Sequence, residues 1–150
     1  MGERPADRVW LAAAIELSRR CTPAQTAFSV GAVIVAADDT QIATGYSRER
    51  DPTEHAEEAA LRKLDPGDPR LVGATIYSSL EPCGARKSRP RSCATLIVAA
   101  GIRRVVYALR EPPTFVEGAG DEQLREAGIE VVEIADLAGD VRQVNVHLLR

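Results

Sequence analysis

Hydrophobic residues recur along the first third of the chain with two different periods. Residues 7–20 carry a helix-period apolar stripe, which consists of Val9, Trp10, Ala13, Ala14 and Leu17. Residues 30–37 form a short run rich in β-branched side chains, and residues 41–46 form a second one after a polar turn at 38–40. The pattern therefore predicts a helix followed by a β-hairpin whose first strand is buried.

The remaining elements are separated by clear start and stop signals. Asp51 can cap a helix, Pro52 suits its first position and Glu54 completes a capping box, so we expect a helix from this point to about residue 64. Gly101 and Gly128 each end a later predicted helix. The further elements that the pattern predicts are strands at 74–79, 104–109 and 129–134 and helices at 93–100, 120–127 and 137–149.

This order of elements, αββαβαβαβα, predicts an α/β fold in three layers, α/β/α. A hairpin opens a five-stranded mixed sheet, and helices then cross between strands, which makes the later strands parallel. No internal repeat or linker interrupts the pattern. We therefore expect residues 1–150 to form a single domain.

Composition is that of an ordinary globular domain. The chain has 150 residues, of which 45% are hydrophobic and 27% charged. No apolar run approaches the ~18–20 residues that a membrane helix needs. The first ten residues lack the apolar stretch of a secretory signal, so we expect a cytoplasmic protein. Three cysteines in such a chain argue against a disulfide framework.

Charge is acidic overall but unevenly spread. The net charge is −3, and there are only six aromatic residues, which argues against a nucleic-acid partner. Yet residues 82–110 hold seven basic side chains and no acid. Four of the seven lie in what we name the basic loop, residues 84–92, and they are Arg86, Lys87, Arg89 and Arg91. The loop is either a solvated connection or an anion site beside a pocket.

Three residues with zinc-ligand chemistry fall at the ends of predicted elements. His55 lies near the start of the second helix, Cys83 follows the third strand, and Cys93 opens the next helix. One imidazole and two thiolates leave the fourth position of a tetrahedral zinc for water, which is the catalytic pattern, because structural sites usually have four protein ligands. Helix N-termini also favour thiolate over thiol. The sequence therefore predicts one Zn²⁺ held by His55, Cys83 and Cys93.

Glu57 follows the histidine by two positions. On a continuous helix the two side chains point about 200° apart, so they can converge only at the helix N-terminal end. That arrangement suits a metal ligand with a neighbouring proton carrier, and Glu57 is the expected catalytic acid–base. The alternative is a solvated acid in the first turn of a helix.

H-x-E followed by P-C-x-x-C is typical of zinc nucleobase deaminases, and in this chain the second cysteine lies further along than in that spacing. The chain resembles the cytidine-deaminase-like superfamily in V-G-A-V-I-V at 30–35, H-A-E-E-A-A at 55–60 and L-E-P-C at 80–83. It is most similar to the deaminase domain of riboflavin-biosynthesis enzymes, whose substrate is a phosphorylated diaminopyrimidine. Here nine residues separate the cysteines, one more than is general in those deaminases, and Arg89 occupies their basic position.

The resemblance implies the same three zinc ligands with Glu57 as proton shuttle, and a pocket lined by Ser79 and Leu80. It also implies a hydrolytic deaminase of an amino-substituted pyrimidine, as base, nucleoside or nucleotide, that releases ammonia. Arg86 and Arg89 are expected to bind an anionic group of that substrate. Association through the helices beside the zinc site implies a homodimer or larger homo-oligomer. The alternatives are a zinc-stabilised binding module without turnover and a guanine or nucleic-acid deaminase.

Overall fold

The computed structural model describes residues 2–84, 91–112 and 120–149. One five-stranded mixed sheet lies at its centre, with the strand order β2-β1-β3-β4-β5. The strands are β1 Gly31–Val35, β2 Gln41–Tyr46, β3 Thr75–Leu80, β4 Arg104–Leu109 and β5 Glu130–Glu133. The helices are α1 Asp7–Ser18, α2 Ala56–Arg62, α3 Cys93–Ala100, α4 Gly120–Glu126 and α5 Ala138–Val144.

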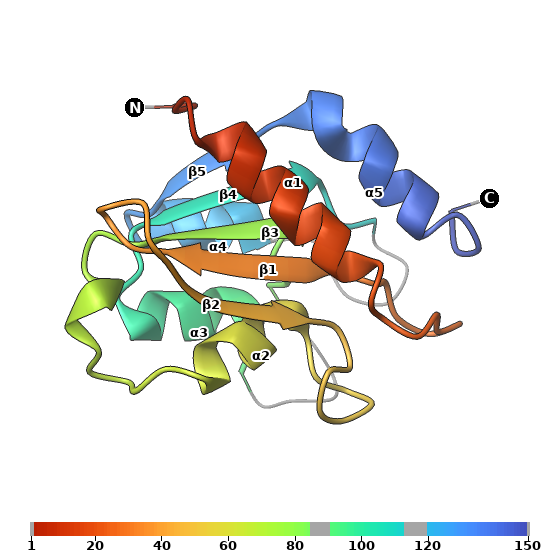
Figure 1. Ribbon diagram of the computed structural model, residues 1–150, viewed down its shortest axis with the longest axis horizontal. Coiled ribbons are helices and arrows are strands. Elements are labelled where there is room, and N and C mark those ends of the chain that lie inside the picture. The colour runs from red at the N-terminus through yellow and green to blue at the C-terminus, as the bar shows by residue number, and fades with distance from the viewer. Residues whose placement is uncertain (1, 85–90, 113–119, 150) are drawn as a thin grey trace.

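Helices cover both faces of this sheet, as Figure 1 shows, with α1 and α5 on one face and α2, α3 and α4 on the other. β1 pairs antiparallel with both β2 and β3, whereas β3–β4 and β4–β5 pair parallel. The predicted three-layer α/β/α fold, with its opening hairpin and later parallel strands, is confirmed. Two short 3-10 helices, Pro69–Leu71 and Ala135–Leu137, are additional, and α5 ends five residues earlier than predicted.

Two glycines allow helices to approach the sheet closely. A Cβ at Gly31 would lie 1.9 Å from the carbonyl oxygen of Ala14 in α1. On the neighbouring strand, a Cβ at Gly45 would lie 2.4 Å from the carbonyl oxygen of Ala56 in α2. The helices therefore rest directly on backbone on opposite faces of the hairpin, which fixes α2 against β2.

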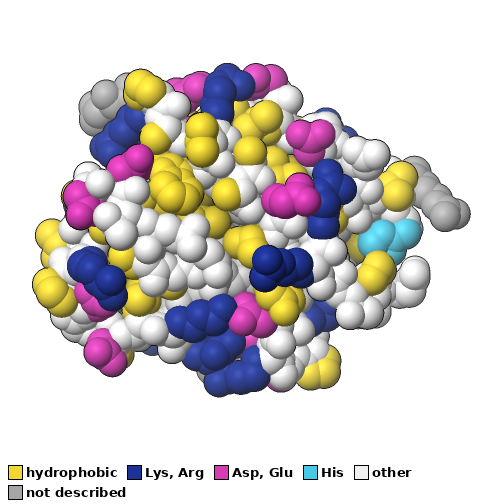
Figure 2. Space-filling model, in the orientation of Figure 1, with side chains coloured by type: hydrophobic (Ala, Val, Ile, Leu, Met, Phe, Trp, Pro, Cys, Tyr) yellow, Lys and Arg dark blue, Asp and Glu magenta, His cyan; other side chains and the backbone are white. Residues whose placement is uncertain are grey.

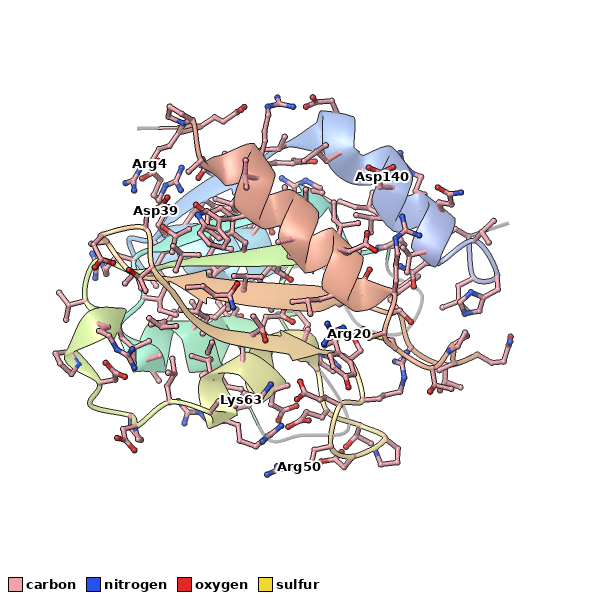
Figure 3. The ribbon with its side chains drawn as sticks, in the orientation of Figure 1. Arg4, Arg20, Asp39, Arg50, Lys63 and Asp140 are labelled. Atoms are coloured by element: carbon pink, nitrogen blue, oxygen red, sulfur yellow. The ribbon has the colours of Figure 1, made fainter. Side chains whose placement is uncertain are left out.

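The buried face of α1 overlaps the predicted one but is centred on neighbouring residues. Its buried residues are Asp7, Leu11, Ala14, Ile15 and Ser18, whereas Val9 is exposed. Trp10 is only partly buried, and its indole Nε1 donates to Asp39 at the tip of the β1–β2 turn, 2.7 Å away (Figure 3). Ala14 is in the core, and Trp10, Ala13 and Leu17 pack partly against it, so the predicted helix period is confirmed and only Val9 lies off the buried side.

The start of α2 was also misplaced. Asp51 accepts from the backbone N–H of Thr53 at 2.9 Å, which makes a local turn instead of a helix cap. Glu54 is buried and pairs with Arg62 at 2.9 Å. The helix begins at Ala56, and the Glu58 carboxylate accepts from the backbone N–H of His55 at 3.0 Å. The capping box is therefore formed four residues later than predicted.

The surface over α1 and α5 mixes acidic and basic side chains, as Figure 2 shows. Within the described parts of the chain, no helix is both long enough and apolar enough to cross a bilayer.

Candidate metal centre

Strand direction explains why the predicted ligands meet. Because β1 is antiparallel to both β2 and β3, these two strands and the parallel β4 all end at the same edge of the sheet. His55 lies on the connection after β2, Cys83 lies just after β3, and α3 returns to that edge with Cys93 as its first residue. Carboxyl ends of strands and helix N-termini are a common place for binding sites in α/β sheets.

The three side chains form a compact group. The Nδ1 atom of His55 lies 3.6 Å from the Sγ atom of Cys83 and 3.3 Å from that of Cys93. All three ligand atoms lie within 4.8 Å of one another. Zinc bound tetrahedrally at about 2.1 Å from nitrogen and 2.3 Å from sulfur would place these atoms about 3.6 Å apart. The observed separations therefore fit a zinc ion.

Local hydrogen bonds hold Cys83 as a thiolate. The backbone N–H of Cys93, the first of helix α3, donates to the Cys83 sulfur at 3.3 Å, and the next N–H, of Ala94, donates to the Cys83 carbonyl at 3.1 Å. Hydrogen bonding to the Cys93 side chain and to His55 lowers the pKa of Cys83 to about 4, despite burial. A thiolate is the form that binds metal.

Glu57 occupies the second position of α2 and is only 3% exposed. Ionisable residues are almost never this buried unless they are paired or functional. The solvated first-turn alternative is therefore wrong. The position of Glu57, two residues from His55 on the turn that begins at the metal group, is consistent with its predicted role as a proton carrier.

The other predicted residues have different outcomes. Ser79 is buried, and its hydroxyl accepts from the backbone N–H of Gly31 at 3.1 Å, while Leu80 is buried three residues before Cys83. Their contact with substrate stays a prediction. Arg86 and Arg89 lie outside the described residues, and Arg91 at the end of the basic loop is exposed.

Sequence reasoning missed two residues that support this site, Glu58 and Glu81. The signal for Glu58 was available, because it follows His55 by the three positions of a capping box. Glu81 stands in the L-E-P-C motif but was treated only as part of the resemblance. It is buried beside Cys83 and accepts two backbone hydrogen bonds.

Comparison with known proteins agrees with this geometry. Residues 5–109 match the model of the cytidine and deoxycytidylate deaminase zinc-binding region. The chain is 43% identical over 122 residues to the diaminohydroxyphosphoribosylamino-pyrimidine deaminase of Schizosaccharomyces pombe, covering 80% of this chain and 30% of that protein.

Solved structures give the same picture. The Aspergillus oryzae Rib2 deaminase in complex with DARIPP superposes with a TM-score of 0.81 at 26% identity, over 95% of this chain and 91% of that one. The RibD protein of Acinetobacter baumannii superposes with a TM-score of 0.76 at 35% identity, over 95% of this chain and 38% of that one. The chain thus spans about a third of the length of some relatives and nearly all of another. It belongs to the cytidine and deoxycytidylate deaminase zinc-binding family.

Proposed function

We propose that this chain is a zinc-dependent hydrolytic deaminase of an aminopyrimidine, with His55, Cys83 and Cys93 as ligands and Glu57 as the catalytic acid–base. The observation that carries the proposal is the group of three ligand atoms within 4.8 Å, together with the burial of Glu57 two residues after His55. A binding module without turnover has no use for a buried acid beside an open metal position.

Each residue of the candidate site has its own role in the proposed reaction. His55 and the two cysteines hold the metal, and the start of α3 keeps the Cys83 thiolate in place. Zinc, when bound, is a Lewis acid that lowers the pKa of water toward ~7 and so supplies a nucleophile at neutral pH. Glu57 carries one proton of the water to a ring nitrogen and the other to the amino group. The water oxygen bonds to the ring carbon that bears the amino group, the bond between that carbon and the amino nitrogen breaks, and ammonia leaves behind a ring carbonyl.

We further propose a phosphorylated diaminopyrimidine as the substrate. The Schizosaccharomyces pombe and Aspergillus oryzae relatives, whose names and ligand indicate this class of molecule, support the choice. The position of the basic loop supports it as well, since residue 84 is adjacent to Cys83 and residue 91 is two residues before Cys93. Arginine side chains in this loop would suit the phosphate oxygens.

An ammonia-release screen tests the reaction and the substrate together. Phosphorylated and dephosphorylated diaminopyrimidine ribosides, cytidine, deoxycytidylate and guanine are compared with the zinc-loaded protein. We expect turnover of the phosphorylated diaminopyrimidine, and loss of both zinc and turnover in Cys83→Ala and Cys93→Ala. Full zinc occupancy in both variants would refute the ligand assignment, and turnover of another substrate alone would refute the substrate.

The basic loop has a separate test. In the double variant Arg86→Ala/Arg89→Ala we expect KM for the phosphorylated substrate to rise more than kcat falls, and inorganic phosphate to compete with substrate in the wild type. Arg142→Ala, which removes an exposed arginine from α5, is the matched control. An unchanged KM in the double variant would make the loop only a connection.

A further inference from the structure

The proposed reaction gives no role to the buried carboxylate of Glu81. Glu81 is 4% exposed and is the first residue after β3. Its Oε1 atom accepts from the backbone N–H of Glu111 at 3.0 Å, and its Oε2 atom accepts from that of Asp121 at 2.9 Å. The backbone N–H of Glu81 donates to the carbonyl of Leu109 at 2.8 Å. One residue thus connects the end of β3 to the end of β4 and to the start of α4.

Gly120, the first residue of α4, reinforces this connection. A Cβ at this position would lie 1.6 Å from the carbonyl oxygen of Pro82 and 3.3 Å from the carbonyl carbon of Cys83. No left-handed backbone angle requires glycine here, so close approach alone explains it. α4 therefore rests directly on the segment Glu81-Pro82-Cys83, which we name the ligand turn.

The ligand turn is held on its other side by α3. The first two N–H groups of α3 donate to the sulfur and the carbonyl of Cys83, as described above. α3 and α4 are themselves linked, because the Gln123 side-chain amide donates to the Thr95 hydroxyl at 2.9 Å. The ligand turn thus lies between two helices that contact each other, and the Glu81 carboxylate is its bond to one of them.

We propose that Glu81 and Gly120 are positioning residues that place the Cys83 thiolate at the distance from His55 and Cys93 that a metal ion requires. The inference rests on the metal site of the proposed function. Polar oxygens are costly to bury unless they are hydrogen-bonded, and both carboxyl oxygens of Glu81 are. Groups that orient metal ligands without touching the metal typically contribute 10–100-fold to metal affinity.

Cobalt titration of the purified full chain tests this positioning without using activity. Co²⁺ in place of zinc reports thiolate ligation through its charge-transfer and d–d absorption bands. Glu81→Gln keeps the side-chain shape but replaces one acceptor oxygen by a donor, which opposes a backbone N–H. Gly120→Ala pushes a methyl group into the Pro82 carbonyl. We expect both variants to bind Co²⁺ at least about tenfold more weakly, with shifted charge-transfer bands.

Matched controls separate positioning from loss of stability. Gly139→Ala adds the same methyl group near the start of α5, where nothing lies within 4 Å of the added Cβ, and should bind Co²⁺ like the wild type. Asp7→Asn removes a buried carboxylate that binds Arg104 at the start of β4, whereas the ligand turn follows the opposite end of the parallel strand β3. It should lower the melting temperature and leave the Co²⁺ bands and affinity unchanged.

The outcomes distinguish a failure of the proposed metal site from a failure of the positioning role of Glu81. If wild-type protein shows no thiolate–Co²⁺ bands that depend on Cys83, both the metal site and the positioning role are refuted. If wild type binds Co²⁺ and Glu81→Gln matches it in affinity and spectrum, only the positioning role is refuted. Equal weakening by Asp7→Asn, or a Glu81→Gln variant that does not fold, would show a general contribution to stability and would also refute it. If Gly120→Ala fails to fold, Glu81→Gln decides.

Discussion

At the scale of single residues, the burial of Glu57 has a direct consequence for catalysis. In the variant Glu57→Gln the side chain keeps its shape and most of its hydrogen bonds, but an amide cannot carry a proton as a carboxylate does. Positioned acid–base groups contribute typically ~10²–10⁴-fold to rate, so we expect turnover to fall by at least about 100-fold while zinc is retained. Steady-state kinetics with metal analysis checks this. Glu126→Gln, an exposed acid in α4, is the control. Unchanged turnover in Glu57→Gln would exclude it as the shuttle.

A second buried acid, Asp7, stabilises the opposite end of the sheet. Its carboxylate accepts from the Arg104 guanidinium at 2.8 and 2.6 Å and from the Tyr77 hydroxyl at 2.7 Å. Burial alone would raise the pKa of Asp7, but the bonds from Arg104, the backbone of Arg4 and Tyr77 lower it below its ordinary value. Asp7 therefore stabilises the fold above its unfolded pKa, about 3.9.

Because the folded pKa of Asp7 is depressed, its contribution is lost as pH falls through that folded value. At pH 7, Asp7→Asn removes the closer of the two acidic partners of the buried Arg104 and leaves only Glu130, at 3.5 Å. Breaking a buried ion pair in this way should cost about 3–5 kcal/mol of unfolding free energy. We expect the difference in unfolding free energy between wild type and variant to become smaller below pH ~4. Urea unfolding at several pH values measures it. Asp140 is an exposed acid on α5 (Figure 3), and the control variant Asp140→Asn should have the same unfolding free energy as the wild type at every pH. A stability difference between wild type and Asp7→Asn that does not change with pH would contradict the assigned role of the Asp7 charge.

The candidate metal ligands were predictable from the sequence, but the roles of the buried acids Glu81 and Asp7 were not. His55, Cys83 and Cys93 carry a chemistry that spacing and element ends already indicate. Glu81 binds the backbone of Asp121, which is 40 positions away along the chain. Asp7 binds Arg104, which is 97 positions away. No local pattern marks such pairs. An acid whose partner is distant looks like any surface acid in the sequence.

At the scale of elements, helix and strand boundaries were predictable where the local sequence permits only one interpretation. β2, α3 and β4 have the predicted bounds, and Gly101 ends α3 in the left-handed conformation with φ 86°. The start of α2 failed because two acids, Asp51 and Glu54, offered a capping box that the folded chain uses otherwise. Asp51 forms a local turn, and the buried Glu54 pairs with the exposed Arg62.

The packing of α2 on β2 predicts the effect of adding one methyl group at Gly45. A Cβ there would lie 2.4 Å from the Ala56 carbonyl and 2.5 Å from the Ala60 nitrogen, so the helix backbone must move away. Overpacking of this kind costs typically about 1–3 kcal/mol, and we expect Gly45→Ala to lose that much unfolding free energy. Gly67→Ala, with nothing within 4 Å of its Cβ, is the control in urea denaturation. Equal stability of the two variants would show that α2 shifts freely.

At the scale of the whole molecule, α3 has more apolar surface than one chain covers. All eight residues from Cys93 to Ala100 are apolar except Thr95. In the single chain Val98 is 39% exposed, and Ala99 is exposed beside it. A helix that is apolar on nearly all sides is normally buried on all sides. The first turn of this helix holds Cys93, so a partner on its outer face would lie near the metal group.

We therefore expect two copies of the chain to associate through the outer face of α3. Val98→Glu places a charge on that face, and a charge buried without a partner opposes association. At micromolar concentration, light scattering should give a dimer or larger assembly for the wild type and a monomer for Val98→Glu. Val9→Glu is the matched control, because Val9 is 69% exposed on α1, on the opposite face of the sheet. It should leave the assembly intact. A monomeric wild type would contradict the prediction. An assembly that survives Val98→Glu but not Val9→Glu would move the interface to α1.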